Sequence, residues 1–167
     1  MSLIIEDGSI VSEADSLVTR AEFIAYAASI GVTIDDSDDS DVLLVKAMKF
    51  IDSYENKIKG VKIDREQSLS FPRYNLVVNG WSWNTDEIPT EAKRCQMELA
   101  LDVNSGTDLY NLTYSKGPRI EETVSGAVTV KYGTTSAMAS KTKSRGLTLL
   151  DSLLKTSGLQ SIKLVRA

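Results

Sequence analysis

The stretch that decides the fold is "DVLLVKAMKFIDSYENKIK", residues 41–59. Its apolar residues recur at intervals of three and four, the spacing of the buried side of an amphipathic helix. This stripe consists of Leu44, Ala47, Met48, Ile51, Tyr54 and Ile58. The sequence therefore predicts a helix over about Asp41 to Lys59, with the stripe in a hydrophobic core.

An earlier helix is marked by its capping residues. Thr19 and Glu22 have the spacing of a capping box, and Val18 and Phe23 occupy the flanking staple positions. A helix is expected over about residues 20–30, because a glycine follows that can end it.

The acidic run "DDSDDSD", residues 35–41, has two interpretations. As a calcium loop it would carry Asp41 in place of the tight-turn glycine and Ala47 in place of the bidentate glutamate. We favour the other interpretation, in which the carboxylates stabilise the start of the following helix through its dipole.

Two more helices are expected downstream. Pro89 suits the first turn of a helix that runs to about Asn104. Its buried side is expected to hold Ala92, Cys95, Leu99 and Val103. A short helix is indicated by "LTLLDSLL", residues 147–154, with Gly158 as its stop.

Strand signals separate these helices. "VVNGWS", residues 77–82, places a two-residue hairpin turn at Asn79-Gly80. Alternating residues over 120–132 indicate a second hairpin, with Ser125-Gly126 as its turn. The predicted fold is mainly α, a small helical bundle with a β-hairpin and an extended C-terminal arm.

The predicted organisation has three parts. "GTTSAMASKTKSRG", residues 133–146, is small and polar and is typical of a flexible linker. It follows a helical domain with hairpins over residues 1–132. It precedes a C-terminal helix and tail over residues 147–167.

Composition argues for contact rather than catalysis. The 167 residues include no histidine and one cysteine, Cys95, so imidazole bases and disulfides within the chain are excluded. We expect no catalytic, cofactor-binding or metal-ligating residues, and a protein that is not an enzyme. With no signal-peptide pattern and no long apolar run, it is expected to be neither secreted by that route nor membrane-bound.

The charge is unevenly distributed along the chain. Residues 1–56 carry 12 acidic and 3 basic groups, whereas residues 131–167 carry 1 acidic and 7 basic groups. An acidic body therefore precedes a basic tail. Such a tail either binds phosphate or an acidic partner, or is one of two solvated surfaces.

Several motifs occur in an order that resembles a known family. They are "EDGSIVSEADSLVTRAEFIAYAASIG" from Glu6, "QSLSFPR" from Gln67, "IPTEAKRCQMELAL" from Ile88, "EETVSGAVTVKYG" from Glu121 and the closing "LVRA". The set is similar to the head-to-tail connector, or adaptor, proteins of tailed bacteriophages, which often carry a DnaT-like single-stranded DNA-binding label. Phe71 departs from the tryptophan usual in that family.

The resemblance implies a structural virion protein at the neck between capsid and tail, present in the host cytoplasm during assembly. Its partners would be the portal protein, tail or neck proteins, and copies of itself in a ring, by analogy a dodecamer. Genomic double-stranded DNA would pass through the ring without specific binding, and the acidic body offers it few counter-charges.

The resemblance also assigns portal docking to the C-terminal segment. The apolar candidates are Leu147, Leu150, Leu154, Ile162 and Leu164. The cationic candidates are Lys155, Lys163 and Arg166. In the alternative, the leucines cover the core of their own domain.

The proline-containing segment from Gln67 to Trp83 is the candidate ring contact. Pro72 fixes its own φ and favours an extended Phe71, so this loop holds one shape without regular hydrogen bonding. The ring-interface candidates are Gln67, Phe71, Pro72, Arg73, Trp81 and Trp83. Within one subunit, the same loop would pack over the bundle instead.

A single-stranded DNA-binding accessory protein is the alternative function. Such proteins need a basic groove interleaved with stacking aromatic residues. Trp81 and Trp83 lie near Asp86 and Glu87, and only the tail is strongly basic. On these grounds the sequence favours the connector.

Overall fold

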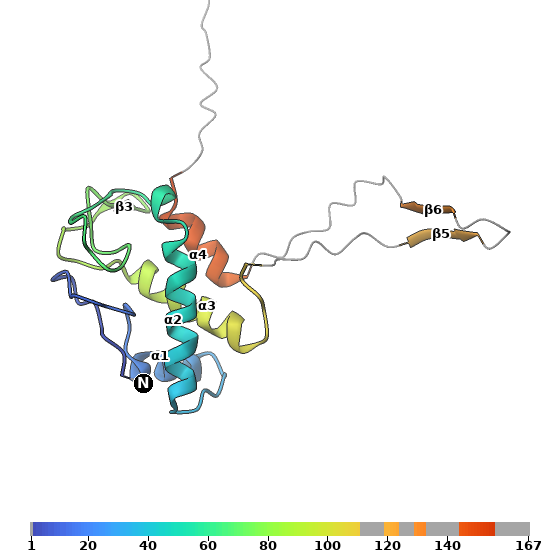
Figure 1. Ribbon diagram of the computed structural model, residues 1–167, viewed down its shortest axis with the longest axis horizontal. Coiled ribbons are helices and arrows are strands. Elements are labelled where there is room, and N and C mark those ends of the chain that lie inside the picture. Colours follow the sequence, from blue (N-terminus) through green and yellow to red (C-terminus); the bar gives the residue numbers. More distant parts are fainter. Residues whose placement is uncertain (1, 111–118, 124–128, 133–143, 156–167) are drawn as a thin grey trace, which may run out of the picture.

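Four α-helices form the body of the molecule in the computed structural model, which describes residues 2–110, 119–123, 129–132 and 144–155. They are α1 (Arg20–Ser29), α2 (Asp38–Asp52), α3 (Thr90–Asn104) and α4 (Arg145–Leu153). α2 runs through the length of the body, and α3 packs against both α2 and α4 (Figure 1). The prediction of a mainly α domain is confirmed.

The capping box of α1 forms as predicted. The Thr19 hydroxyl accepts from the Glu22 backbone N–H at 3.1 Å, and the Glu22 carboxylate accepts from the Thr19 N–H at 2.7 Å. Val18 and Phe23, the two staple residues, are both buried. Two otherwise unpaired donors at the start of the helix are thereby satisfied.

α2 is shifted towards the N-terminus and is shorter than predicted. It ends at Asp52, where the Ser53 hydroxyl donates to the Phe50 carbonyl at 2.6 Å, and a 3-10 turn, η1 (Glu55–Lys57), follows. Ile58 is still buried, but it reaches the core from extended backbone after η1. The lysines that follow Asp52 therefore lie on a turn and a strand instead of a helix surface.

The buried side of α3 carries one polar residue that joins three segments. Gln96 is fully buried, and its Oε1 accepts from the Leu17 N–H at 2.9 Å. Its Nε2 donates to Ser16 Oγ at 2.9 Å and to the Leu44 carbonyl at 3.1 Å. Each side-chain atom is paired, so the amide fixes α3 against α2 and the segment before α1 without an unsatisfied group.

Three small antiparallel pairs complete the described structure. They are β1 (Val61–Lys62) with β2 (Arg73–Tyr74), β3 (Val77–Val78) with β4 (Trp81–Ser82), and β5 (Arg119–Thr123) with β6 (Thr129–Tyr132). Asn79 and Gly80 have φ values of 52° and 85°, as the predicted turn between β3 and β4 requires. The β5–β6 pairing confirms the second hairpin, while its turn at Ser125-Gly126 lies outside the described residues.

α4 packs into the core of the same chain. Leu150 and Leu153 are buried, and a Cβ at Gly146 would lie 2.8 Å from the Leu99 side chain. The helix begins at Arg145, inside the segment predicted as linker; residues 133–143 and the stop at Gly158 lie outside the described part. No helix in that part has the length and apolarity needed to cross a membrane.

Candidate functional site

Four lysines from two distant segments come together at one end of the body. We call Lys57, Lys59, Lys62 and Lys155 the lysine cluster. Backbone pairing brings the segments together: the Lys155 N–H donates to the Lys57 carbonyl at 2.7 Å, and the Lys59 N–H donates to the Leu153 carbonyl at 2.9 Å. A β-bridge between Ile58 and Leu154 lies between these two bonds.

The ammonium groups of the cluster have different partners. Lys59 Nζ donates to the Ser152 carbonyl at 2.7 Å, and Lys155 Nζ donates to the Asn56 carbonyl at 3.4 Å. These acceptors are neutral, so the bonds position the two amines without cancelling their charge. Lys62 Nζ lies 3.2 Å from Glu55 Oε2, which does neutralise one member of the cluster.

An open groove of about 560 Å³ adjoins the cluster. We call it the lysine groove, and its lining residues are Lys59, Gly60, Asn75, Val77, Asn79, Gly80, Asp151, Ser152 and Lys155. Two ammonium groups and two side-chain amides outnumber its one carboxylate. The groove therefore presents donors and a small positive charge, as an anionic chain requires.

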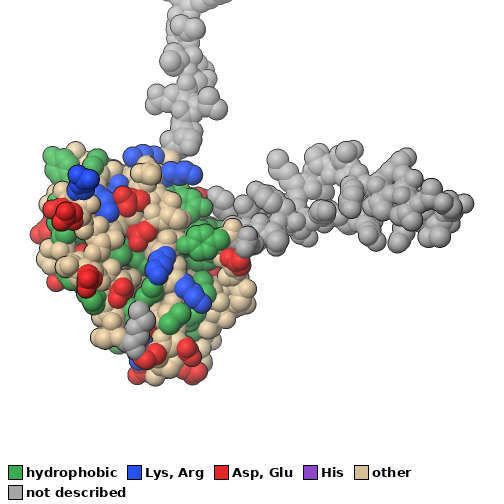
Figure 2. Space-filling model, in the orientation of Figure 1, with side chains coloured by type: hydrophobic (Ala, Val, Ile, Leu, Met, Phe, Trp, Pro, Cys, Tyr) green, Lys and Arg blue, Asp and Glu red, His purple; other side chains and the backbone are tan. Residues whose placement is uncertain are grey.

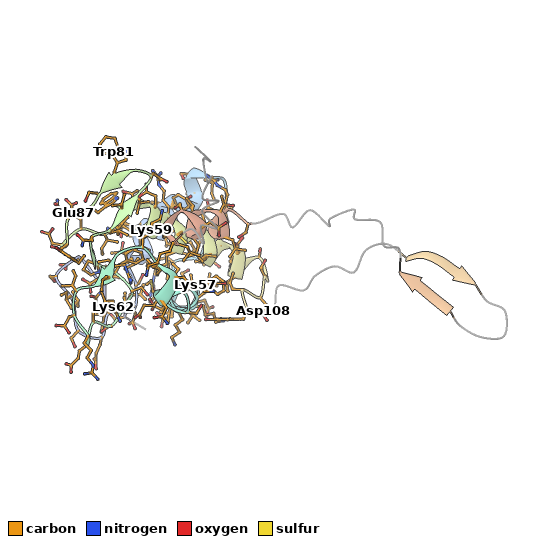
Figure 3. All side chains as sticks on the ribbon, turned by 90° about the horizontal axis from the view of Figure 1, so that it is seen from above. Lys57, Lys59, Lys62, Trp81, Glu87 and Asp108 are labelled. Atoms are coloured by element: carbon orange, nitrogen blue, oxygen red, sulfur yellow. The ribbon has the colours of Figure 1, made fainter. Side chains whose placement is uncertain are left out.

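Two exposed aromatic residues follow or precede groove residues in the chain: Trp81 follows Gly80, and Tyr74 precedes Asn75. Trp81 opens β4 and is 77% exposed, and Tyr74 in β2 is 54% exposed. Figure 3 shows Trp81 projecting outward from the body, with Lys59 between it and Lys57 in that view. A large exposed indole near paired lysines can stack on a flat ligand whose charged part the lysines bind.

The opposite end of the body is acidic. On the face shown in Figure 2, acidic side chains gather where α2 begins, and Lys and Arg side chains lie where α4 ends. At the acidic end Arg20 donates to Asp41, to Asp36 at 3.2 Å and to Asp38 at 3.0 Å, and these bonds raise the pKa of Arg20. Asp38, Asp39 and Asp41 do lie in the first turn of α2, as expected, but the N-cap residue Ser37 makes no side-chain capping bond.

The proline-containing loop is held within one chain. Arg73 is buried, and its guanidinium donates to the carbonyls of Lys59 at 2.8 Å, Ser70 at 3.0 Å, Gly60 at 3.2 Å and Glu55 at 3.5 Å. Burial lowers the pKa of Arg73. These bonds fix the turn that presents Lys57, Lys59 and Lys62.

The other ring-interface candidates divide into buried and exposed residues. Phe71 and Pro72, joined by a cis peptide bond, and Gln67 are buried, and Gln67 Nε2 donates to the carbonyls of Leu69 and Pro72, each at 2.9 Å. Trp83 is half-buried against the core, whereas Trp81 is exposed. The loop thus packs over its own bundle, the alternative that the sequence left open.

The portal-docking candidates are divided as well. Leu150 is buried, and Leu147 and Leu154 pack partly buried against the same core. Lys155 belongs to the lysine cluster. Ile162, Lys163, Leu164 and Arg166 lie outside the described residues.

Sequence reasoning missed most of the lysine cluster. It extended the helix to Lys59, which scattered Lys57 and Lys59 around a helical surface. Two signals of the cluster were available in the sequence. They are Ser53, which follows the last residue of α2, and the spacing of the lysines in "KIKGVK", residues 57–62. Pairing of this segment with residues after α4 has no signal in the sequence.

The described residues hold no arrangement typical of catalysis. They contain no group of three or more His, Cys, Asp or Glu that could hold a metal ion. Burial raises the pKa of the Cys95 thiol to about 12, which keeps it protonated and unreactive.

Comparison with known proteins identifies the family. A family model described as "Putative DnaT-like ssDNA binding protein" matches residues 1–167. No curated protein and no solved structure matches the chain.

This match corrects the interpretation as a bacteriophage connector. The matched model is not a head-to-tail connector family. The prediction of portal, tail and ring partners is therefore wrong. The prediction that double-stranded DNA passes through a ring without specific binding is wrong as well. The alternative raised from the sequence is the one that the match supports.

Proposed function

We propose that this chain, which belongs to the DnaT-like ssDNA binding family, binds single-stranded DNA. The family match over residues 1–167 is the observation that carries the proposal. The geometry supports it, because single-strand binders combine a cationic groove along the phosphates with aromatic rings on which bases stack.

The lysine groove supplies the cationic part of this proposal. Lys59 and Lys155 have neutral backbone acceptors, which a phosphate oxygen can replace or share. Asn75 and Asn79 add amide donors at the same surface. Trp81, which follows the groove residue Gly80 in the chain, supplies the stacking ring.

The sequence after the lysine groove carries further positive charge. Lys155 is the last described residue, and Lys163 and Arg166 follow it in the chain. In this proposal the basic residues after Lys155 add to the attraction between the chain and the DNA phosphates.

The chain is proposed to act by binding alone. No histidine is available as a general base, and Cys95 is buried with a raised pKa. Affinity for the sugar-phosphate backbone and for unpaired bases then constitutes the activity. Weak dependence on base sequence is expected, because every base offers a face for stacking.

Titration of a fluorescent oligo-dT with wild type and Trp81→Ala tests the proposal. Base stacking contributes about 1–3 kcal/mol, so the variant is expected to bind about fivefold to a hundredfold more weakly. Trp81→Phe keeps a ring and is the matched control. Equal binding by Trp81→Ala contradicts the assignment of the site, and a wild type that binds no single strand contradicts the function.

A further inference from the structure

The β3–β4 hairpin separates two grooves of different chemistry. The lysine groove is lined by Val77 on β3 and by the turn residues Asn79 and Gly80. A second groove, of about 540 Å³, lies along β4 and the loop after it; we call it the β4 groove. It is lined by Tyr74, Asn75, Ser82, Trp83, Asn84, Thr85 and Asp86.

The hairpin is anchored through a strand and its turn, while the Trp81 side chain is exposed. Val78, the cross-strand partner of Trp81, is buried, and the Trp83 N–H donates to the Leu76 carbonyl at 2.9 Å. Asn79 Nδ2 donates to Glu91 on α3 at 3.2 Å. These contacts hold the hairpin in place and leave the Trp81 indole 77% exposed.

The two grooves differ in how they meet a phosphate chain. The lysine groove offers two ammonium groups against the single carboxylate of Asp151. The β4 groove offers hydroxyl and amide groups with Asp86, and the neighbouring Glu87 accepts from the Asn84 N–H at 3.3 Å. A DNA strand is therefore attracted by the ammonium groups of the lysine groove. A second DNA strand along the β4 groove would meet no ammonium group.

We propose that the hairpin seats DNA at a junction between single strand and duplex. This inference rests on the proposed single-strand binding. The bound strand lies in the lysine groove, and Trp81 stacks on the last base pair. The complementary strand is turned aside along the β4 groove, where Asn75, Asn84 and Thr85 can hydrogen-bond to it without attracting it by charge.

Physical reasons favour this occupant over a uniform single strand. A rigid projection between two grooves fits a substrate whose two strands diverge at one point. Aromatic or apolar groups that pack against a terminal base step replace the stacking that the step lacks. A continuous single strand would use the lysine groove and Trp81 but would leave the β4 groove empty.

The test compares three DNAs with the intact protein: a fork, its single strand and its blunt duplex. The fork is expected to bind at least threefold more tightly than the single strand. 2-Aminopurine at the junction is expected to change fluorescence on binding, whereas the same base ten pairs inside the duplex is not. Equal affinity for fork and single strand overturns the inference but leaves the proposed function intact; failure to bind any DNA overturns both.

Two variants locate the effect. Trp81→Ala is expected to bring the ratio of fork to single-strand affinity close to one, because the junction loses its stacking surface. Asp86→Lys is expected to raise affinity for blunt duplex at least twofold, because the second strand is then attracted. An unchanged ratio in Trp81→Ala, or an unchanged duplex affinity in Asp86→Lys, overturns the roles of the hairpin and the β4 groove.

Discussion

The backbone N–H of Lys155 donates to the carbonyl oxygen of Lys57 at 2.7 Å. This bond brings Lys57, at the end of η1, and Lys155, which follows α4, to one surface. The lysine cluster therefore exists only while α4 is packed on the body. Affinity for DNA and the packing of the C-terminal helix are expected to change together.

Gly146→Val tests this coupling. A Cβ at this position would lie 2.8 Å from the Leu99 side chain and 3.0 Å from its backbone nitrogen. Overpacking of this kind costs about 1–3 kcal/mol, so the melting temperature should fall. Affinity for oligo-dT should fall as well, because Lys155 is displaced.

The matched control for that variant is Thr148→Ala, at an exposed position on the same helix. Amide hydrogen exchange over α4 provides the direct measurement. If the amides of α4 exchange as slowly in Gly146→Val as in wild type, the close packing of Gly146 against Leu99 is contradicted.

Arg73→Ala is expected to destabilise the fold strongly. The change leaves carbonyls of Lys59, Ser70 and Gly60 without their buried donor. Each unsatisfied buried group costs about 1–3 kcal/mol, and partial access of water should keep the total at about 2–4 kcal/mol. Urea denaturation gives the free energy of unfolding.

Arg65→Ala is the control for this prediction, since Arg65 is exposed. A change in unfolding free energy no larger for Arg73→Ala than for Arg65→Ala would show that the four carbonyl bonds contribute little.

Asp52 is expected to make stability depend on pH. Burial raises the pKa of Asp52, even though Ser70 donates to its Oδ1 from its backbone at 2.9 Å and its hydroxyl at 2.6 Å. The folded state therefore binds the proton more tightly than the unfolded state. Its stabilising contribution is complete below the ordinary aspartate pKa of about 4 and decreases as pH rises through the raised pKa.

Asp52→Asn isolates this contribution. The amide keeps an acceptor for Ser70 and has no charge to bury, so the variant should be more stable than wild type at pH 7 and should lose part of the pH slope. Asp102, whose pKa burial also raises, contributes a slope in the same direction, whereas Glu22, whose pKa the bonds from Thr19 lower, contributes one in the opposite direction. Thermal unfolding from pH 4 to 8 measures both; identical profiles for variant and wild type would refute the assignment.

Glu55→Gln is expected to strengthen binding to single-stranded DNA. Glu55 lies 3.2 Å from Lys62 and neutralises it. Surface ion pairs contribute about 0.2–1 kcal/mol, so release of Lys62 from this partly buried pair should raise affinity by up to about fivefold at low salt. Filter binding of oligo-dT measures this change, with Glu13→Gln in the N-terminal segment as control. An affinity for Glu55→Gln no higher than that of Glu13→Gln would place Lys62 outside the interface.

The elements with strong local signals were predictable from the sequence. Thr19 and Glu22 marked the start of α1, and Asn79-Gly80 marked the β3–β4 turn, because capping and turn chemistry depend on residues a few positions apart. The end of α2 was placed too late, since the apolar spacing continues through Tyr54 and Ile58 after the helix has ended. Periodicity alone does not distinguish a helix from a turn that buries the next residue at the same spacing.

The binding surface depended on contacts between distant segments. Lys155 was recognised as a cationic binding residue, but its position beside Lys57 and Lys59 requires the packing of α4 on α3. Arg73 and Phe71 were expected at an interface because arginine and aromatic residues are enriched there. Buried loops use the same residue types, and the sequence does not reveal which of the two roles they have.

The most direct test of the central claim is the salt dependence of binding to a fluorescent single-stranded oligonucleotide, with the matching duplex as competitor. Each phosphate that a lysine neutralises contributes a slope of about −0.7 in log K against log salt. We expect micromolar or tighter affinity for the single strand, preference over the duplex, and a slope that Lys59→Gln with Lys155→Gln reduces by about 1.4 but Arg94→Gln does not. No measurable affinity at low salt, or a slope unaffected by the double variant, would contradict single-strand binding at the lysine groove.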